Sequence, residues 1–306
     1  MTILIFEQLL KMFFIMLLAF LCYKIKLVSQ EGNRSVSNLL LLVVNPCLIL
    51  TVYQETEYDP ELIRGLLLAF AAAALCHVIG IIITSVLIRP QDRPDCSIER
   101  YSAMYSNCGF IGIPLVSNVL GGNGIFYLTA YMVAFNLFSW THGVILMEKK
   151  CSLKNLKEGI LSPMFLSTAA AVLLFFLHIR IPDVLLDSMN YIADMNTPLA
   201  MMVAGFSVAQ ADLGKMLRNL RIYYISFLKL ILFPLFTIGI LKIMALPADV
   251  CTTVLIGASC PAAATGTMMA IRYKQNYTYS SEIFALTTAL AVFTIPAVVF
   301  LSELVL

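Results

Sequence analysis

The residues best suited to chemistry stand around two prolines that interrupt apolar segments. In the first interruption, Gly109 and Gly112 each weaken a helix by up to about 1 kcal/mol relative to Ala. Pro114 removes a backbone donor and clashes with the preceding turn, so we expect it to break the helix. Broken backbone survives at membrane depth only where it is buried in protein or lines a wet cavity. The amide of Asn107 therefore stands near freed backbone groups, a combination that predicts a substrate site.

The second interruption has the same character and stands at the corresponding place in the other half of the chain. Small residues and Pro261 break the apolar run 257–266, and Pro261 follows Pro114 by about half of the 306 residues. Paired breaks of this kind are the best sequence indication of a transporter's binding site. We expect backbone N–H groups and the positive ends of half-helices to face an anion there. The predicted substrate-binding residues are Asn107, Gly109, Gly112, Pro114, Cys260, Pro261, Ala262, Gly266 and Lys229.

Lys229 is included because it places a charge near the middle of the apolar stretch 222–245. A lysine at the bilayer centre costs about 2.5–3.5 kcal/mol on insertion scales, so it is functional and paired by default. We consider it a counter-ion to the substrate or a partner to an acid such as Asp194. Snorkelling to the membrane surface is the alternative.

Two histidines, His77 and His142, lie in other apolar segments. Since histidine titrates near neutrality, a proton relay is one reading, with Asp194 as a further candidate for coupling or support. Each histidine is alone in its segment, and a satisfied structural histidine is the reading that this isolation favours.

The composition identifies a membrane protein and excludes several classes. The chain is 60% hydrophobic and 12% charged, whereas a soluble domain is about 25% charged. Apolar runs of roughly 20 residues suit membrane helices rather than barrel strands. No phosphate-binding loop, zinc motif or convincing Ser/His/Asp set appears, so we predict no enzyme, cofactor or metal site. The basic loops are short, so we predict no nucleic-acid partner.

We predict ten membrane-spanning helices in an all-α protein. The fourth and ninth are broken, and a tight turn at 121–124 separates the fourth from the fifth. The expected spans are 3–23, 37–53, 66–88, 101–120, 125–147, 160–178, 185–211, 222–245, 250–271 and 283–306.

The basic residues alternate between the loops of this map. Cytoplasmic loops are rich in Lys and Arg, so the pattern predicts that both termini lie outside. Only Arg64, Arg180 and Lys242 fall on the opposite side. The predicted cytoplasmic set is Lys24, Lys26, Arg34, Arg89, Arg93, Arg100, Lys149, Lys150, Lys154, Lys157, Lys215, Arg218, Arg221, Arg272 and Lys274.

Ten spans divide into two sets of five. We predict one repeat at 1–148, a cytoplasmic linker at 149–159 and a second repeat at 160–306. Because five is odd, the second repeat must enter the membrane in the opposite orientation, which makes the repeats inverted. A further pair of matched breaks, which we assign to a scaffold rather than to substrate contact, is Asn45 with Pro46 and Asn196 with Pro198.

These motifs resemble the auxin efflux carrier family in its compact bacterial form, over essentially the whole chain. Asn107 with Gly112-Ile113-Pro114 resembles the Asn-x-x-x-x-Gly-Ile-Pro motif of the plant carriers. The runs 121–124 and 140–143, and Pro261 with its downstream residues, are similar too. This chain has Gly266 where the plant carriers have a second proline, and it lacks their long cytosolic loop.

The resemblance implies a two-domain transporter in the bacterial inner membrane. Spans 1, 2, 6 and 7 would form a scaffold that dimerises, and spans 3–5 and 8–10 a mobile transport domain. The broken helices would cross at Pro114 and Pro261, with the substrate beside them. Bacterial relatives are linked to small carboxylates such as malate or malonate.

Three functions follow as hypotheses. The first is a secondary active or facilitative transporter of small organic anions with an elevator-type movement. The second is a sodium-coupled carrier like the bile-acid symporters, although the ninth span lacks their Glu and Gln residues. The third is a membrane-embedded enzyme or sensor, which would need His77, His142 and Asp194 in one cavity.

Overall fold

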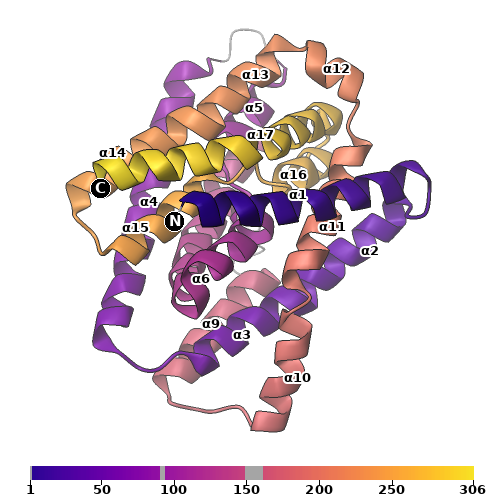
Figure 1. The fold of residues 1–306 in the computed structure, drawn as a ribbon. Coiled ribbons are helices and arrows are strands. Elements are labelled where there is room, and N and C mark those ends of the chain that lie inside the picture. The colour runs from indigo at the N-terminus through magenta and orange to yellow at the C-terminus, as the bar shows by residue number, and fades with distance from the viewer. Residues whose placement is uncertain (1, 90–93, 149–160) are drawn as a thin grey trace.

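The computed structural model describes residues 2–89, 94–148 and 161–306. Within these ranges the chain is helical and contains no β-strand, which confirms the all-α class (Figure 1). In chain order, with η marking π-helical turns, the elements are α1 (Thr2–Lys24), α2 (Gln30–Leu39), η1 (Leu40–Val44), α3 (Asn45–Glu55), α4 (Pro60–Leu87), α5 (Cys96–Met104), η2 (Cys108–Gly112), α6 (Ile113–Phe138), η3 (Ser139–Gly143), α7 (Val144–Glu148), α9 (Pro163–Phe176), α10 (Asp183–Ala193), α11 (Asn196–Gln210), α12 (Leu213–Arg218), α13 (Leu220–Phe227), η4 (Leu228–Leu232), α14 (Phe233–Met244), α15 (Ala248–Ser259), α16 (Thr265–Arg272) and α17 (Tyr277–Val305).

Seven helical stretches of the described chain are long and apolar enough to cross a membrane. Two shorter apolar helices, α9 and α15, accompany them. The protein is therefore a multi-pass membrane protein. The seven stretches are Thr2–Lys24, Gln30–Glu55, Pro60–Leu87, Cys108–Glu148, Asp183–Gln210, Leu220–Met244 and Tyr277–Val305.

The structure turns the chain at the predicted position 121–124, between two helices that together make up α6. The chain bends at the single residue Gly121, which has φ 62° and ψ −149°, and helix resumes directly after it within α6. Glycine adopts this backbone conformation without steric cost, so one residue suffices for the bend. The predicted linker 149–159 lies outside the described residues, as do Arg93, Lys149, Lys150, Lys154 and Lys157.

Proline does not break the helix at Pro114, contrary to the sequence-based expectation. It stands in the first turn of α6, directly after η2. Pro46 and Pro234 occupy the same place after η1 and η4. A π-helical turn places the next hydrogen bond five residues back, which spares the bond that a proline cannot make. The helix continues past each of these prolines. The break that was expected at Pro114 lies before η2 instead, at Tyr105–Asn107.

The helices pack as two neighbouring groups. In one, α1 runs along α11, and α3 packs against α9 and α10. In the other, α4, α6, α14, α15 and α17 pack on one another. The groups meet where α17 contacts α1 and α11, where α6 contacts α1, α3 and α9, and where α11 contacts η2. The two termini lie together, since the hydroxyl of Thr2 donates to the carboxylate of Glu303 at 3.1 Å (Figure 1).

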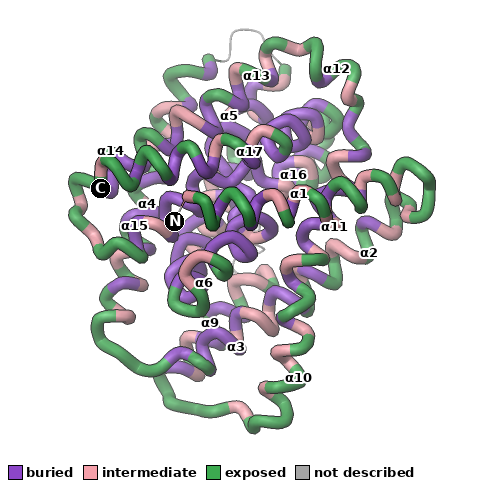
Figure 2. Tube along the Cα trace, viewed as in Figure 1, coloured by how far each residue is buried: buried purple, intermediate pink, exposed green. Residues whose placement is uncertain are grey.

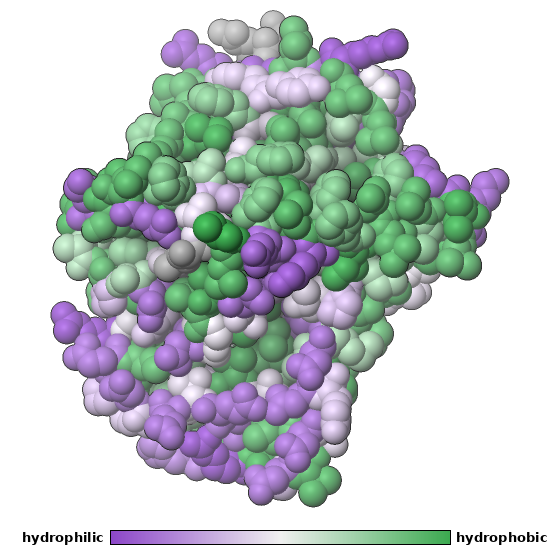
Figure 3. All heavy atoms as spheres, viewed as in Figure 1, coloured by the Kyte–Doolittle hydropathy of each residue, from purple (hydrophilic) through white to green (hydrophobic). Residues whose placement is uncertain are grey.

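Burial and hydropathy agree with a molecule surrounded by lipid. Buried residues concentrate in the interior of the molecule and are densest in α6, α15 and α17 (Figure 2). Large apolar side chains are exposed on the outer faces, among them Phe14, Leu67, Ile243 and Phe293. Figure 3 shows hydrophobic residues across much of one face, with hydrophilic residues at its upper rim, at its lower end and in a small patch near its centre. An apolar surface of this extent matches hydrocarbon rather than water.

Gly205 permits the close contact of α11 with α1. A Cβ atom at Gly205 would meet the backbone of Met16 and would lie 2.8 Å from the Cβ of Ala19. We expect Gly205→Ala to destabilise the protein by about 1–3 kcal/mol, because the two helices would have to separate. Thermal unfolding in detergent would measure the change.

The matched control is Gly239→Ala in α14, where an added Cβ meets no atom within 4 Å. That change should be neutral, or stabilising by up to about 1 kcal/mol, since alanine is the better helix former. Equal melting temperatures for the two variants would contradict the close contact of α1 and α11.

Candidate functional site

Two extended segments from the two halves of the chain cross inside the molecule. The backbone N–H of Asn107 donates to the carbonyl oxygen of Pro261 at 2.8 Å, and the N–H of Ala263 donates to that of Tyr105 at 2.9 Å. The pair forms an isolated antiparallel β-bridge. Each break thus forms hydrogen bonds with backbone groups of the other. Broken helices within a membrane need such partners, because hydrocarbon offers none.

The two breaks have different local causes. Cys260 precedes Pro261, a position from which helical backbone is excluded, and it is extended with ψ 149°. No proline follows Tyr105, which is nevertheless extended with ψ 126°. The second break is therefore specified by its own sequence, whereas the pairing across the crossing accounts for the first.

Lys229 holds the crossing together. Its side chain is fully buried, and Nζ donates to the carbonyl oxygens of Met104 (3.3 Å) and Ala258 (3.1 Å) and to the hydroxyl of Ser106. An ammonium has three donors, and all three are used. Met104 ends α5 and Ala258 stands one residue before the end of α15. A cation at two helix C-termini is favoured by their dipoles as well as by the hydrogen bonds.

These contacts correct the expectations for Lys229. Snorkelling is wrong, because the side chain has no exposed surface. Pairing with Asp194 is wrong too, since Asp194 is exposed and caps the end of α10. The ammonium instead lies within the crossing, with the ring of Phe233 4.9 Å from Nζ.

In the crossing of the extended segments 105–107 and 261–263, the side-chain amide of Asn107 is a hydrogen-bond donor without a partner. Its side chain is only 6% exposed, and Nδ2 has no hydrogen-bond partner among the described residues. The first hydrogen bonds of the helical run that follows are made by Ile111 and Gly112 to the carbonyl oxygen of Asn107. A Cβ atom at Gly109 would meet nothing within 4 Å, so open space adjoins this turn. An unpaired amide and a helix N-terminus thus stand beside room for a ligand.

The Pro261 side of the crossing is closed, which differs from the expectation of free N–H groups at both breaks. The N–H of Ala262 donates to Oγ1 of Thr287 at 3.2 Å. The first amides of α16 are also used, since Gly266 donates to Ala263 at 2.9 Å. Cys260 is fully buried, with its Sγ 3.4 Å from where a Cβ at Gly112 would stand. These residues fit tightly together and leave the free donors on the Asn107 side.

The two histidines flank Tyr105 near the crossing. His77 is fully buried, shares a 2.7 Å hydrogen bond between Nδ1 and the carbonyl of Ala73, and has a ring centroid 6.1 Å from that of Tyr105. The Nδ1 of His142 lies 3.1 Å from the Tyr105 hydroxyl. Asp194 is exposed at the end of α10, which packs on α3 and η1. The enzyme or sensor hypothesis requires these three residues in one cavity. They do not share one, because Asp194 lies away from the two histidines.

The scaffold asparagines bind each other. Nδ2 of Asn196 donates to Oδ1 of Asn45 at 2.6 Å, and both side chains are buried. Pro46 follows in the first turn of α3 and Pro198 in that of α11. The bond joins the two halves of the chain at the matched breaks.

Sequence reasoning missed three polar residues that complete the crossing. Ser106 accepts from Lys229, Thr287 accepts from Ala262, and the Tyr105 hydroxyl donates to Phe138 at 2.7 Å. Ser106 adjoins Asn107, and that adjacency was a usable signal. Thr287 lies in a long apolar helix with nothing in its neighbourhood to distinguish it.

Comparison with known families adds one finding. The sequence model of the family described as Membrane transport protein matches residues 4–152 and 149–299. The matches span nearly the whole chain. No curated protein matches it.

Proposed function

This chain belongs to the auxin efflux carrier family of membrane transport proteins, and from that premise we propose that it carries small organic anions. The substrates would be mono- or dicarboxylates such as malate or malonate. Transport would be facilitative, or coupled to a gradient. The unpaired Nδ2 of Asn107 beside open space at Gly109 carries the proposal.

A carboxylate suits this position for physical reasons. The Asn107 amide is a hydrogen-bond donor without a partner, and it stands at the positive end of the helical run that begins with η2. Both features favour negative charge. Hydrogen bonds to a charged group contribute about 1.5–3 kcal/mol, enough to select a carboxylate over a neutral analogue. Lys229 would act on this site indirectly, by fixing the crossing that positions Asn107.

The packing supports an elevator-type movement as part of the proposal. Helix α11 contacts η2, so the substrate turn faces a helix of the neighbouring group. The group with α1, α3, α9, α10 and α11 would be the scaffold, and the group with α4, α6, α14, α15 and α17 the transport domain. Sliding of the second group along α11 would expose the Asn107 turn alternately to the two sides. The scaffold group would also form the homodimer.

Topology and location belong to the same proposal. Ten spans in two inverted repeats would place both termini outside a bacterial inner membrane. The adjacency of Thr2 and Glu303 supports an even number of crossings, because it requires both termini on one side. Accessibility of a cysteine introduced at Thr2, tested with an impermeant thiol reagent on intact cells of a variant lacking other reactive thiols, would determine that side.

The test of function is uptake of labelled malate and malonate into proteoliposomes under imposed sodium and pH gradients. We expect saturable uptake that does not depend on sodium, and the pH arm would report proton coupling. A strict requirement for sodium would favour the bile-acid-symporter-like alternative. Absence of carboxylate uptake by folded protein would overturn the organic-anion proposal and leave the family membership intact.

A further inference from the structure

His77 is a buried base with one ring nitrogen unused. It lies in α4, its side chain has no exposed surface, and Nδ1 is 2.7 Å from the carbonyl oxygen of Ala73. A carbonyl only accepts hydrogen bonds, so Nδ1 carries the hydrogen and donates it. Nε2 therefore holds a lone pair, and it has no hydrogen-bond partner among the described residues. A buried lone pair of this kind is a place for a proton or for the hydrogen of a water molecule.

Two hydroxyl groups connect His77 with the crossing. The ring centroids of His77 and Tyr131 are 5.5 Å apart. The hydroxyl of Tyr131 is buried, makes no hydrogen bond to a described residue, and lies near the hydroxyl of Ser106. Ser106 directly precedes Asn107, whose Nδ2 is also unpaired. A line of polar groups thus extends from the substrate site to His77, and a proton can follow it through the hydroxyls and interposed water.

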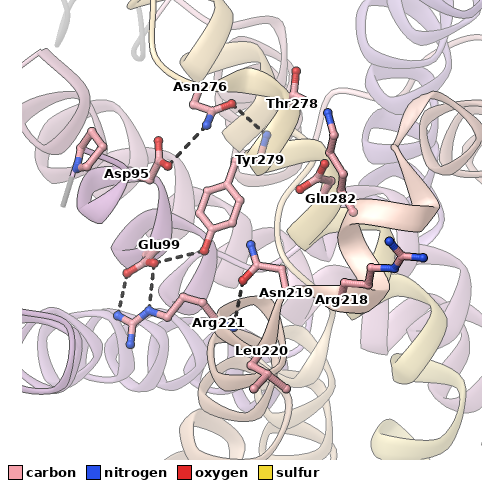
Figure 4. Close-up of a pocket in the computed structure, with 12 residues that line it drawn as sticks. Asp95, Glu99, Arg218, Asn219, Leu220, Arg221, Asn276, Thr278, Tyr279 and Glu282 are labelled. Atoms are coloured by element: carbon pink, nitrogen blue, oxygen red, sulfur yellow. Dashed lines mark hydrogen bonds and ion pairs between the residues drawn. The ribbon is translucent and has the colours of Figure 1, made fainter.

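The helices around His77 bring no carboxylate to it in the described chain. Helix α4 packs against α5, α6, α14 and α15. The acidic residues of these four helices are Glu99 and Asp249. Arg221 donates to both carboxylate oxygens of Glu99, at 2.9 and 2.7 Å (Figure 4), and Asp249 lies in the first turn of α15. A positive charge on His77 would thus find no counter-charge among these side chains.

Lys229 is the cation that acts on His77 from the crossing. The other basic residues of the packed helices are Arg100, which donates to carbonyl oxygens at the end of α4, and Lys242, which is exposed. Glu61 and Arg64 pair with each other in the exposed start of α4. The remaining titratable side chains of α4 and of the helices packed on it are thiols and phenols, which are neutral in their ordinary form: Cys76, Cys96, Tyr101, Tyr127, Tyr131 and Cys251.

The charge balance of the site depends on the substrate. Among the buried side chains of the described ranges, Lys229 is the one lysine or arginine, so the empty crossing carries its positive charge alone. A dicarboxylate dianion brings a second negative charge that Lys229 does not offset, and an uncompensated charge at membrane depth is costly. A proton on Nε2 of His77 supplies the missing positive charge. In the empty carrier the same proton would only add to the charge of Lys229.

We infer that His77 takes up a proton when a dicarboxylate dianion binds at Asn107 and releases it when the dianion leaves. The inference rests on the organic-anion function proposed above and assigns the proton as its coupling ion. The proton adds to the lone pair of Nε2, Nδ1–H stays bonded to Ala73, and the imidazole becomes an imidazolium. Because α4 belongs to the same group of helices as α15 and α17, the proton and the substrate would move together.

Isothermal titration calorimetry of malonate into the purified full chain tests the inference. Titrations in buffers of different ionisation enthalpy, at a pH where malonate is fully ionised, give the number of protons taken up for each malonate bound. For the native protein we expect about one proton, and an affinity that falls about tenfold for each unit of pH increase, because binding includes the proton. His77→Gln should bind malonate without proton uptake and with an affinity that does not change with pH.

The matched control is His178→Gln, an exposed position just after α9, which should keep the native proton uptake. Malonate binding by the native protein without proton uptake would overturn the inference and leave the organic-anion function intact. Proton uptake that survives His77→Gln, or that His142→Gln abolishes in its place, would overturn it as well. Absence of malonate binding by folded native protein would overturn both proposals. The native titration needs no variant, so the test stands if His77→Gln fails to fold.

Discussion

Replacing Asn107 by alanine is expected to reduce carboxylate uptake at least about tenfold while leaving the fold intact. The amide that is lost donates to no other group, so no buried partner is stranded. The backbone N–H of Asn107 still donates to Pro261, and the crossing persists. What disappears is one hydrogen bond to a charged substrate, worth about 1.5–3 kcal/mol. Initial rates of labelled malate uptake into proteoliposomes measure the loss.

The control for this prediction is Asn136→Ala. Asn136 is a half-buried amide on α6, with no side-chain bond to another described residue. It matches the chemistry of the change at a different place, and uptake by this variant should stay near that of the native protein. Unchanged uptake by Asn107→Ala would remove Asn107 from the substrate site.

Replacing Lys229 by methionine is expected to destabilise the whole protein, by roughly 1–3 kcal/mol. The change removes three hydrogen bonds of the ammonium and leaves the buried carbonyl of Met104 without its side-chain donor, whereas Ser106 and Ala258 keep the hydrogen bond between them at 3.1 Å. An unsatisfied buried polar group costs about 1–3 kcal/mol. Methionine has similar length, so the effect reports the lost ammonium rather than a cavity. Thermal unfolding followed by size-exclusion chromatography would show a lower melting temperature and less monodisperse protein.

Lys242→Met supplies the comparison, since Lys242 is exposed in the last turn of α14 and its loss should change stability by less than about 1 kcal/mol. A Lys229→Met variant with native stability and no uptake would reject the structural role. That outcome would restore the reading of Lys229 as a counter-ion to the substrate.

The predictions from sequence succeeded where the residues of one segment determine the conformation of that segment. Cys260 is extended because a proline follows it, and α1, α4 and α17 are apolar runs of sufficient length. They failed where residues elsewhere in the chain determine the conformation. Pro114 was expected to break its helix, but η2 absorbs the proline and the break occurs at Tyr105–Asn107.

The sequence by itself determined a membrane-embedded helical protein with paired breaks in its two halves. Hydropathy over some twenty residues and the local chemistry of proline require no knowledge of neighbours. The tertiary structure alone decided which donors remain free. Asn107 keeps an unpaired amide, whereas the N–H of Ala262 is taken by Thr287, and Lys229 is bound by two breaks far apart in the chain. A hydrogen bond between distant residues depends on their positions in space, which no spacing along the chain encodes.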